Sequence, residues 1–180
     1  MLEIVQAPNN ILSQKAKPVT KVTPDILKII SGMEEALLAA HDPIGVGLAA
    51  PQVGVNLQIF VIKPTNKSPI SVFINPKVKT LGKATKIFKD EDDVKLEGCL
   101  SLLNIWGEVK RSSAISVSYM DETGKQFKKN IKGFTAIIIQ HEADHLNGIL
   151  FPRRVLEQGG TLYKSSKNTK GEDEFEAITI

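Results

Sequence analysis

The sequence predicts an α+β fold in a single domain, with antiparallel or mixed sheets packed around a central helix. Three observations favour this class. Apolar residues recur at helical spacing over residues 23–41, β-branched runs alternate with turn residues through the middle of the chain, and a second helical pattern begins near residue 135. The 180 residues, 42% of them apolar, are enough to bury a core. We expect a core over about 4–155 and a variable tail over 156–180.

The first predicted helix follows an irregular entry segment, residues 1–22. Thr23 is a good N-cap, and Pro24 and Asp25 suit the first helical turn. The apolar residues that follow recur every three or four positions, so the helix is expected to bury one face and to run to about His41. We interpret His41 as an ordinary histidine at the end of this helix.

The middle of the chain predicts strands that are separated by turns. The predicted strands are residues 55–62, 70–74, 114–120 and 126–131. Residues 77–95 mix lysines with acidic residues and are interpreted as a solvated hairpin or loop. From residue 153 onward the chain is expected to be loop-like, with an edge strand over residues 177–180.

Two of the three histidines lie on one turn of the second predicted helix. His141 and His145 are four residues apart, so both imidazoles can reach one point, and Glu142 is adjacent. This is the H-E-x-x-H arrangement, in which two imidazoles hold a divalent metal ion and the glutamate takes a proton from the water that the ion activates. A catalytic site of this kind needs a third protein ligand.

Three sources for the third ligand can be compared. The longer H-E-x-x-H-x-x-G-x-x-H motif is excluded, because Phe151 stands where its last histidine would be. The tail has no evident helical pattern, but it offers the glutamates Glu157, Glu172, Glu174 and Glu176. Cys99 is the only cysteine and lies in the segment EGCLS at residues 97–101. A thiolate is a strong ligand for a borderline-soft metal ion, which favours Cys99.

Three blocks of the sequence resemble the peptide deformylase family. They are GVGLAAPQ at residues 45–52, EGCLS at 97–101 and QHEADH at 140–145, in the order of the family. Together they are highly specific, and the resemblance extends over roughly residues 4–155. It implies a metal-dependent catalytic domain that hydrolyses the N-formyl group from the initiator methionine of nascent polypeptides, giving formate and a free N-terminus.

The resemblance also implies roles for individual residues. The implied metal ligands are Cys99, His141 and His145. Members of the family typically bind ferrous iron (Fe²⁺). Because Ni²⁺, Co²⁺ and Zn²⁺ suit the same ligands, these residues do not determine which of the ions is bound. Glu142 would transfer the proton, while the amide of Gln52 and the backbone N–H of Leu100 would receive the negative charge that develops on the substrate oxygen.

Around these residues the resemblance implies a pocket for a methionine side chain. Its predicted lining is Val46, Gly47, Phe134, Ile137 and Ile138. Glu97 and Asp144 are expected to accept hydrogen bonds from imidazole N–H groups. Arg111 would anchor a carboxylate near the site, with Asp144 or a neighbour of Glu142 as its possible partner and a solvated surface arginine as the alternative. Residues 102–104 depart from the proline and glycine of the family, so the shape of this loop and the preference beyond the first substrate residue stay open.

Composition and charge suggest where the protein works. A single cysteine excludes an intramolecular disulfide and fits a reducing compartment. The first residues carry no signal or transit pattern and no apolar run approaches membrane length, so we expect a cytoplasmic protein. A net charge of +3 gives no argument for DNA binding. The expected partners are N-formylmethionyl nascent peptides, and a transient contact with the ribosome stays open, because the tail does not resemble the docking helix of some deformylases.

Two other functions stay open. One is a zinc endopeptidase with the H-E-x-x-H motif and a tail glutamate as its third ligand. The other is a non-catalytic module that binds a metal ion or a peptide. Replacing Cys99 tests the first alternative and replacing Glu142 tests the second.

Overall fold

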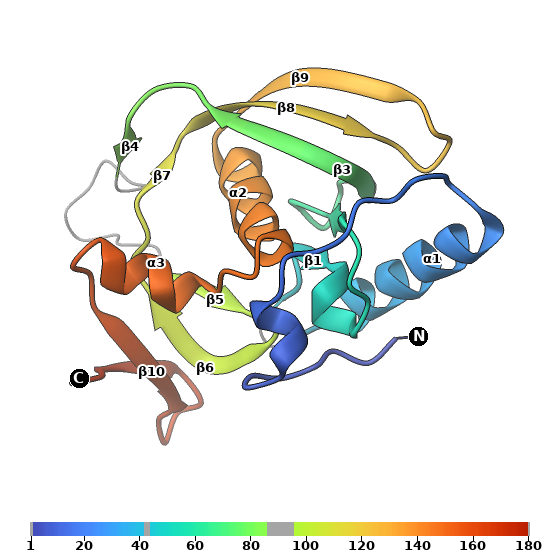
Figure 1. Cartoon of the computed structure of the whole chain (residues 1–180). Helices are drawn as coiled ribbons and strands as arrows, with labels where there is room; N and C mark the ends of the chain where they lie inside the picture. Colours follow the sequence, from blue (N-terminus) through green and yellow to red (C-terminus); the bar gives the residue numbers. More distant parts are fainter. Residues whose placement is uncertain (1, 42–43, 86–95, 180) are drawn as a thin grey trace.

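The computed structural model describes residues 2–41, 44–85 and 96–179, and within these ranges it confirms the α+β fold. Helix α2 (Phe134–Leu146) lies near the centre of the molecule, between a five-stranded and a four-stranded antiparallel sheet (Figure 1). Within the described ranges, no helix is both long and apolar enough to cross a membrane.

The larger sheet carries most of the core. Its strands, in spatial order, are β1 (Gly47–Ala49), β2 (Ile59–Ile62), β3 (Ser71–Thr80), β8 (Ala114–Met120) and β9 (Gln126–Lys132). Every neighbouring pair is antiparallel. A row of stacked rings crosses four of these strands, through Phe60, Phe73, Tyr119 and Phe127. Each ring pair adds about 0.5–1.5 kcal/mol beyond its buried area, which helps to fix the surface on which α2 packs.

Helix α1 (Pro24–Ala39) covers the sheet beside β1 and β2. Thr23 caps it as predicted, because its side-chain oxygen accepts a hydrogen bond from the Ile26 N–H at 3.4 Å. The helix buries Ile30 and Met33. It ends at Ala39 with Ala40 as its C-cap, close to the end predicted near His41, and His41 itself forms an isolated β-bridge with Ile44.

The second sheet positions the EGCLS segment. Its strands, in spatial order, are β11 (Asp173–Ala177), β10 (Leu162–Lys167), β6 (Leu102–Gly107) and β5 (Glu97–Cys99). Helix α3 (Phe151–Glu157) packs against β5 and β6 and buries Phe151 and Val155 with Leu162. The sheet therefore has its own small core, and Cys99 is part of it.

The tail and the segment after EGCLS differ from the prediction. Residues 151–157 form a helix because Phe151 and Val155, four residues apart, bury one face of it, although one helical turn gives a weak sequence pattern. A hairpin follows, and its second strand, an edge strand, ends at Ala177. The edge strand predicted over 177–180 is therefore wrong at residues 178 and 179, and residue 180 lies outside the described ranges. Residues 102–104 begin β6 and do not form a loop.

The remaining short elements complete the chain. They are the 3₁₀ helices η1 (Asn10–Ser13) and η2 (Ala50–Val53) and the two-stranded pair β4 (Ala84–Thr85) and β7 (Arg111–Ser112). The predicted loop over 77–95 is partly wrong, because β3 continues to Thr80. Residues 86–95 lie outside the described ranges.

Strand β9 is the outer strand of the larger sheet. Along this edge the side chains of Lys128, Lys129 and Lys132 are exposed. In Figure 1 strands β3, β8 and β9 lie across the top of the molecule, with α2 beneath them. One face of this part of the sheet is therefore open to solvent.

Candidate metal centre

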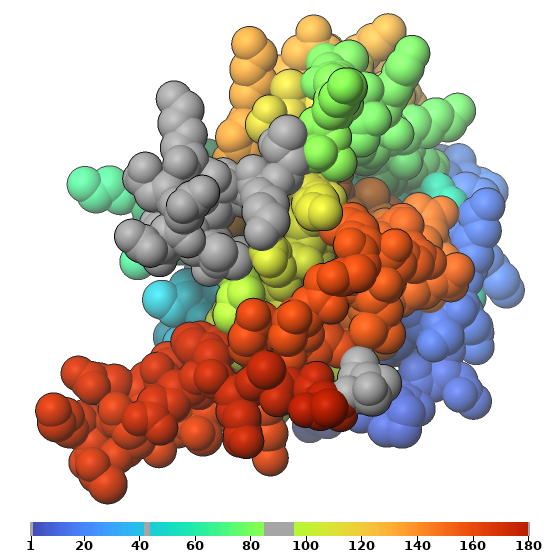
Figure 2. All heavy atoms as spheres, turned by 90° about the vertical axis from the view of Figure 1, so that its left-hand side faces the viewer, coloured from blue at the N-terminus to red at the C-terminus, as the bar shows by residue number. Residues whose placement is uncertain are grey.

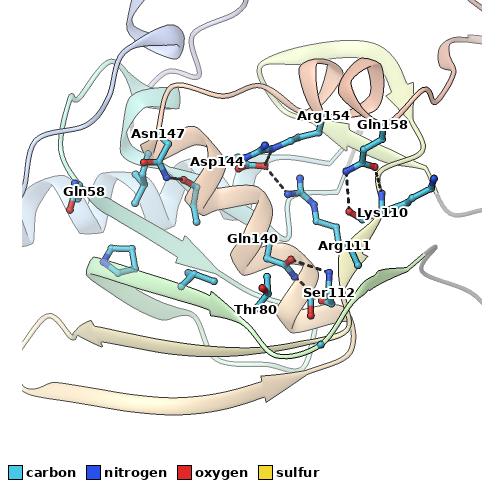
Figure 3. A pocket seen from close by; sticks show the side chains of 16 residues that line it. Gln58, Thr80, Lys110, Arg111, Ser112, Gln140, Asp144, Asn147, Arg154 and Gln158 are labelled. Atoms are coloured by element: carbon cyan, nitrogen blue, oxygen red, sulfur yellow. Dashed lines mark hydrogen bonds and ion pairs between the residues drawn. The ribbon is translucent and has the colours of Figure 1, made fainter.

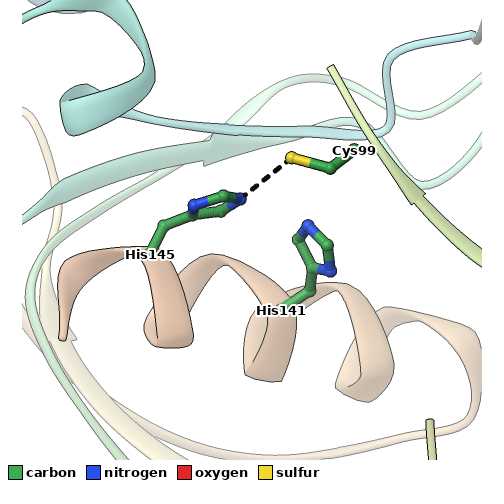
Figure 4. Close-up of side chains that lie close together, drawn as sticks. All are labelled: Cys99, His141 and His145. Atoms are coloured by element: carbon green, nitrogen blue, oxygen red, sulfur yellow. Dashed lines mark hydrogen bonds between the residues drawn. The ribbon is translucent and has the colours of Figure 1, made fainter. Parts of the chain in front are cut away.

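Three side chains from two distant segments converge beside α2. Cys99 stands at the end of β5, and His141 and His145 project from α2 (Figure 4). One ligand atom from each residue lies within 4.8 Å of those of the other two. The Cys99 Sγ and His145 Nε2 atoms are 3.3 Å apart. Cys99 and His145 are buried and His141 is half-buried, so the three donor atoms form one compact, largely enclosed group.

Glu97 orients the His141 ring. Its Oε2 atom lies 3.0 Å from His141 Nδ1. Burial favours the neutral carboxyl group, but hydrogen bonds from Arg111 and His141 prevail and lower the pKa of Glu97 to about 2. An ionised carboxylate can only accept, so a proton is on Nδ1, and Nε2 is the atom through which His141 would bind a metal ion.

Arg111 holds Glu97 and Asp144 together. Its Nε and Nη2 atoms donate to the two Glu97 oxygens at 2.7 and 2.9 Å, and Nη1 donates to Asp144 Oδ2 at 2.7 Å. Arg154 also donates to both oxygens of Asp144 (Figure 3). Arg111 is 6% exposed, so the alternative of a solvated surface arginine is wrong.

The structure corrects the contact expected of Asp144. It hydrogen-bonds to Arg111 and Arg154, and no described imidazole is among its partners. The reason is competition for its oxygens, because the guanidinium groups of Arg111 and Arg154 already occupy both of them. Asp144 thus acts on the centre only through Arg111 and Glu97.

We expect the variant Arg111→Met to be strongly destabilised. Removing the guanidinium leaves the buried Glu97 carboxylate with His141 alone and Asp144 with Arg154 alone, and breaking a buried ion pair typically costs about 3–5 kcal/mol. Chemical denaturation of the metal-loaded protein measures the difference. The matched control is Arg153→Met, because the Arg153 side chain is 67% exposed in its pair with Glu157 and should contribute little. Equal stability of the two variants would contradict the network described here.

Two buried polar atoms in the centre have no hydrogen-bond partner among the described residues: Glu142 Oε2 and His145 Nδ1. Burial raises the pKa of Glu142 to about 7, against the opposing attraction of His141 and Arg111. Burial also lowers the pKa of His145 and so favours the neutral imidazole, which is the form that binds metal ions. One sulfur and two ring nitrogens suit Fe²⁺, Ni²⁺, Co²⁺ or Zn²⁺, so these residues fit such an ion.

Gln52 lies across the centre from α2, in the 3₁₀ helix η2. Its Oε1 atom accepts the Ala49 N–H at 2.8 Å, and its Nε2 donates to Cys99 Sγ at 3.4 Å and Ser101 Oγ at 3.3 Å. The first bond fixes the orientation of the amide, so that the NH₂ group faces the candidate metal ligands. Ser101 is a contact that the sequence did not single out.

Gly47 packs directly against the catalytic candidate Glu142. A Cβ atom at this position would collide with the Glu142 carboxyl group and would lie 2.9 Å from Ile138 Cγ2. Both neighbours are side chains of the central helix, and Glu142 is buried. Any larger residue at position 47 would therefore displace the carboxyl group from its place in the centre.

A cavity of about 490 Å³ opens onto these residues. All five residues predicted for the pocket line it: Val46, Gly47, Phe134, Ile137 and Ile138. It is also lined by Gln52, Glu97, Cys99, Leu100, His141 and Glu142. An apolar cavity with a few polar groups at one end is typical of a ligand site. His145 is not among the residues that line the cavity. Its Nε2 atom reaches the candidate metal centre beside Cys99 Sγ.

Sequence reasoning missed five residues that line this cavity: His41, Ile44, Leu96, Trp106 and Asp173. From the sequence, His41 was expected to be an ordinary histidine at the end of the first predicted helix and not a residue of the site. Trp106 pairs with Gly98 across β5 and β6, and without the β6 strand it had no predicted neighbour. Asp173 lies in the tail that was expected to be a loop. Trp106 and Asp173 reach the cavity through strand pairing in the sheet that contains β6, which joins segments far apart in the sequence.

Comparisons with known proteins agree with this geometry. Residues 1–159 match the family model described as polypeptide deformylase. A peptide deformylase from Desulforudis audaxviator is 38% identical over 164 residues, which is 91% of this chain and 97% of the relative. One from Symbiobacterium thermophilum is 43% identical over 153 residues, 84% of this chain and 65% of the relative.

Solved structures show the same likeness. The crystal structure of the peptide deformylase from Thermotoga maritima has a TM-score of 0.74 and 35% identity, and covers 86% of this chain and 97% of that one. A Met-Ala-Ser-bound class I type b peptide deformylase from Acinetobacter baumannii has a TM-score of 0.73 and 29% identity. The match covers 86% of this chain and 98% of that one.

Proposed function

The chain belongs to the peptide deformylase family, and from this premise we propose how its own residues hydrolyse the N-formyl group of nascent polypeptides. One observation carries the proposal. A cysteine at the end of β5 and two histidines of α2 bring their donor atoms within 4.8 Å, beside a cavity that also contains Glu142. Three protein ligands with room for a small molecule are what a catalytic metal site requires.

Cys99, His141 and His145 would hold one divalent ion. When bound, such an ion lowers the pKa of water from about 15.7 towards neutrality and polarises the formyl oxygen. The family resemblance favours Fe²⁺ as the native ion, while the donor set suits Ni²⁺, Co²⁺ and Zn²⁺ as well. Glu97 keeps the His141 lone pair directed into the centre, and Arg111 keeps Glu97 ionised and in place.

Glu142 would move the proton. Its carboxyl group is buried, lines the cavity and has an Oε2 atom without a partner among the described residues. It would take a proton from the attacking water as the water oxygen bonds to the formyl carbon. It would then give that proton to the amine nitrogen as the C–N bond breaks, which leaves formate and a free N-terminus.

Gln52 and Leu100 would stabilise the oxygen that becomes negative. The Gln52 amide is held by the Ala49 N–H, and its Nε2 hydrogens face the centre. No backbone hydrogen bond outside the described helices and strands engages the Leu100 N–H, and Leu100 lines the cavity. A carboxamide and a peptide N–H can both donate without adding charge.

The substrate would lie along β1. This strand is the outer strand of the larger sheet, and the preceding residues Gly45 and Val46 line the cavity with it. An extended peptide can add to such an edge through backbone hydrogen bonds. The methionine side chain would enter between Val46 and the α2 residues Ile137 and Ile138. The A. baumannii relative with Met-Ala-Ser bound supports a peptide of this kind as the occupant.

We also propose that the whole chain acts as one catalytic unit, since β10 of the tail pairs with β6 beside the centre. The substrate places the enzyme in the cytoplasm, where N-formylmethionyl chains are made, and a transient contact with the ribosome is part of this proposal.

The endopeptidase alternative is less well supported. Within the described residues, the group whose ligand atoms converge contains no tail glutamate. Glu157, now within α3, forms ion pairs with Arg153 and Arg154. A glutamate engaged in this way would have to break both pairs to reach a metal ion.

Release of formate tests the proposed function directly. Metal-loaded protein is mixed with formyl-Met-Ala-Ser, and formate is measured over time. We expect turnover that is lost on treatment with a chelator and restored by added Fe²⁺ or Ni²⁺. Acetyl-Met-Ala-Ser serves as the control substrate and should be cleaved far more slowly, because the cavity end near Gly47 and Glu142 is narrow. If the metal-loaded protein releases no formate, the proposal is wrong.

A further inference from the structure

The hairpin of β10 and β11 lies outside the part of the chain that the family model matches, which ends at residue 159. It extends the sheet that carries Cys99, because β10 pairs with β6 and β6 pairs with β5. Figure 2 shows this C-terminal segment standing out from the body of the molecule at the lower left. The β10–β11 hairpin therefore continues the sheet of β5 and β6 outward from the candidate metal centre.

Side chains of the hairpin hold a residue of the cavity in place. The Trp106 Nε1–H donates to Ser165 Oγ at 2.9 Å, and the Phe175 ring meets the Trp106 ring edge-on at 5.8 Å. The strand registers pair Ser165 with Phe175, next to the pairing of Tyr163 with Trp106. Trp106 lines the cavity, so the hairpin shapes the cavity through this tryptophan.

The hairpin also supplies a charge at the cavity. Asp173, at the start of β11, lines it together with Cys99 and Glu142. The other two carboxylates of the lining, Glu97 and Glu142, are deep in the centre, whereas the Asp173 side chain is 49% exposed. None of the described residues that line the cavity is a lysine or an arginine. The outer part of the cavity therefore carries a half-exposed carboxylate, paired on one side with Lys167, that can also interact with a bound molecule.

We propose that the β10–β11 hairpin is the outer wall of the substrate cleft, and that Asp173 makes the enzyme prefer basic over acidic side chains in the peptide beyond its formylmethionine. The inference rests on the proposed function and deepens it. A peptide that begins at the metal centre must leave the cavity past Trp106 and Asp173. Lys167 pairs with Asp173 at 2.7 Å, but a carboxylate has two oxygens and can accept from a second cation.

The aromatic pair adds to this preference. Lysine and arginine have long apolar stems that pack on aromatic surfaces while their charged ends reach a polar group. The rings of Trp106 and Phe175 offer such a surface beside Asp173, and Phe175 is 46% exposed. An acidic side chain is shorter, gains less from the rings and is repelled by the carboxylate.

The test compares the kcat/KM values of formylated tripeptides. Lysine or glutamate is placed at the second position and, in a second pair of peptides, at the third. For at least one position we expect a ratio of lysine to glutamate peptide of roughly two to five, the range of a partly exposed ion pair. Asp173→Asn should bring this ratio close to one, and 0.5 M salt should reduce it in the wild type.

Glu174→Gln is the matched control. Glu174 is adjacent to Asp173, is exposed and projects from the other face of β11, away from the cavity lining. It should keep the wild-type ratio. A wild-type ratio of one or less at both positions overturns the proposal, and so does a ratio that Asp173→Asn leaves unchanged.

A binding measurement separates this inference from the proposed function. Trp106 is the only tryptophan, so its fluorescence reports on the cavity. The product peptides Met-Ala-Lys and Met-Ala-Glu are titrated into wild type and Asp173→Asn, and the lysine peptide should bind more tightly to the wild type only. If no formylated peptide is turned over but this difference in binding persists, the proposed function fails and the role of Asp173 stands. If formylated peptides are turned over but the lysine and glutamate peptides are not distinguished, the proposed function stands and the role of Asp173 fails.

Discussion

Replacing Cys99 with serine is expected to abolish both metal retention and formate release. Serine is similar in size, so the core formed with Phe151 and Val155 should remain. Its hydroxyl is a poor ligand for a borderline-soft ion, because it stays protonated at neutral pH. Loss of residues that only orient metal ligands already costs 10–100-fold in affinity, and loss of a ligand should cost about 100-fold or more. Metal content after dialysis and formate release measure the two effects.

The control for this variant is Glu157→Gln, which removes the tail glutamate that lies at the end of helix α3. It should keep the wild-type metal content and turnover. If Cys99→Ser retains its metal while Glu157→Gln loses it, the centre would be that of an endopeptidase, and the ligand set proposed here would be wrong.

Glu142→Gln is expected to separate metal binding from catalysis. The glutamine fills the same space beside Gly47 but cannot accept and return a proton at neutral pH. Proton transfer by a positioned group contributes about 10²–10⁴-fold, so kcat should fall by that factor with a normal metal content. Formate release and metal analysis on the same sample measure both quantities.

Glu142→Asp provides a graded comparison. It keeps a carboxylate but shortens the side chain by one methylene, so turnover should lie between that of the wild type and Glu142→Gln. Full activity in Glu142→Gln would be contrary to the mechanism and would favour a module that binds a metal ion or peptide without reacting.

Local patterns explain how much of the centre could be predicted. The spacing of His141 and His145 fixes their common face as soon as the segment is a helix, and α2 includes both. The approach of Cys99 to them is a contact between distant segments, and it was expected mainly through the family resemblance. Asp144 was a possible partner of Arg111 from the sequence, and the structure confirms this contact. The contact of Arg111 with Glu97 could not be assigned, because it requires the positions of β5 and β7 relative to each other.

The fold likewise divides into elements with local sequence signals and elements that depend on contacts between distant segments. Helix α1 was predicted at its start because Thr23 and Pro24 are local signals. Helix α3 was missed because it is short, and its stability comes from burying Phe151 and Val155 against the second sheet. The β10–β11 hairpin has a polar exposed strand whose position depends on pairing with β6, so alternation along the sequence gave no sign of it.

The lysines on strand β9 have a consequence for the protein in concentrated solution. An outer strand presents unpaired backbone groups that can recruit a strand from another molecule and start aggregation. A second copy that approached through its own β9 would bring Lys128, Lys129 and Lys132 against the same three cations. Electrostatic repulsion between these lysines therefore opposes strand pairing of two copies along this edge.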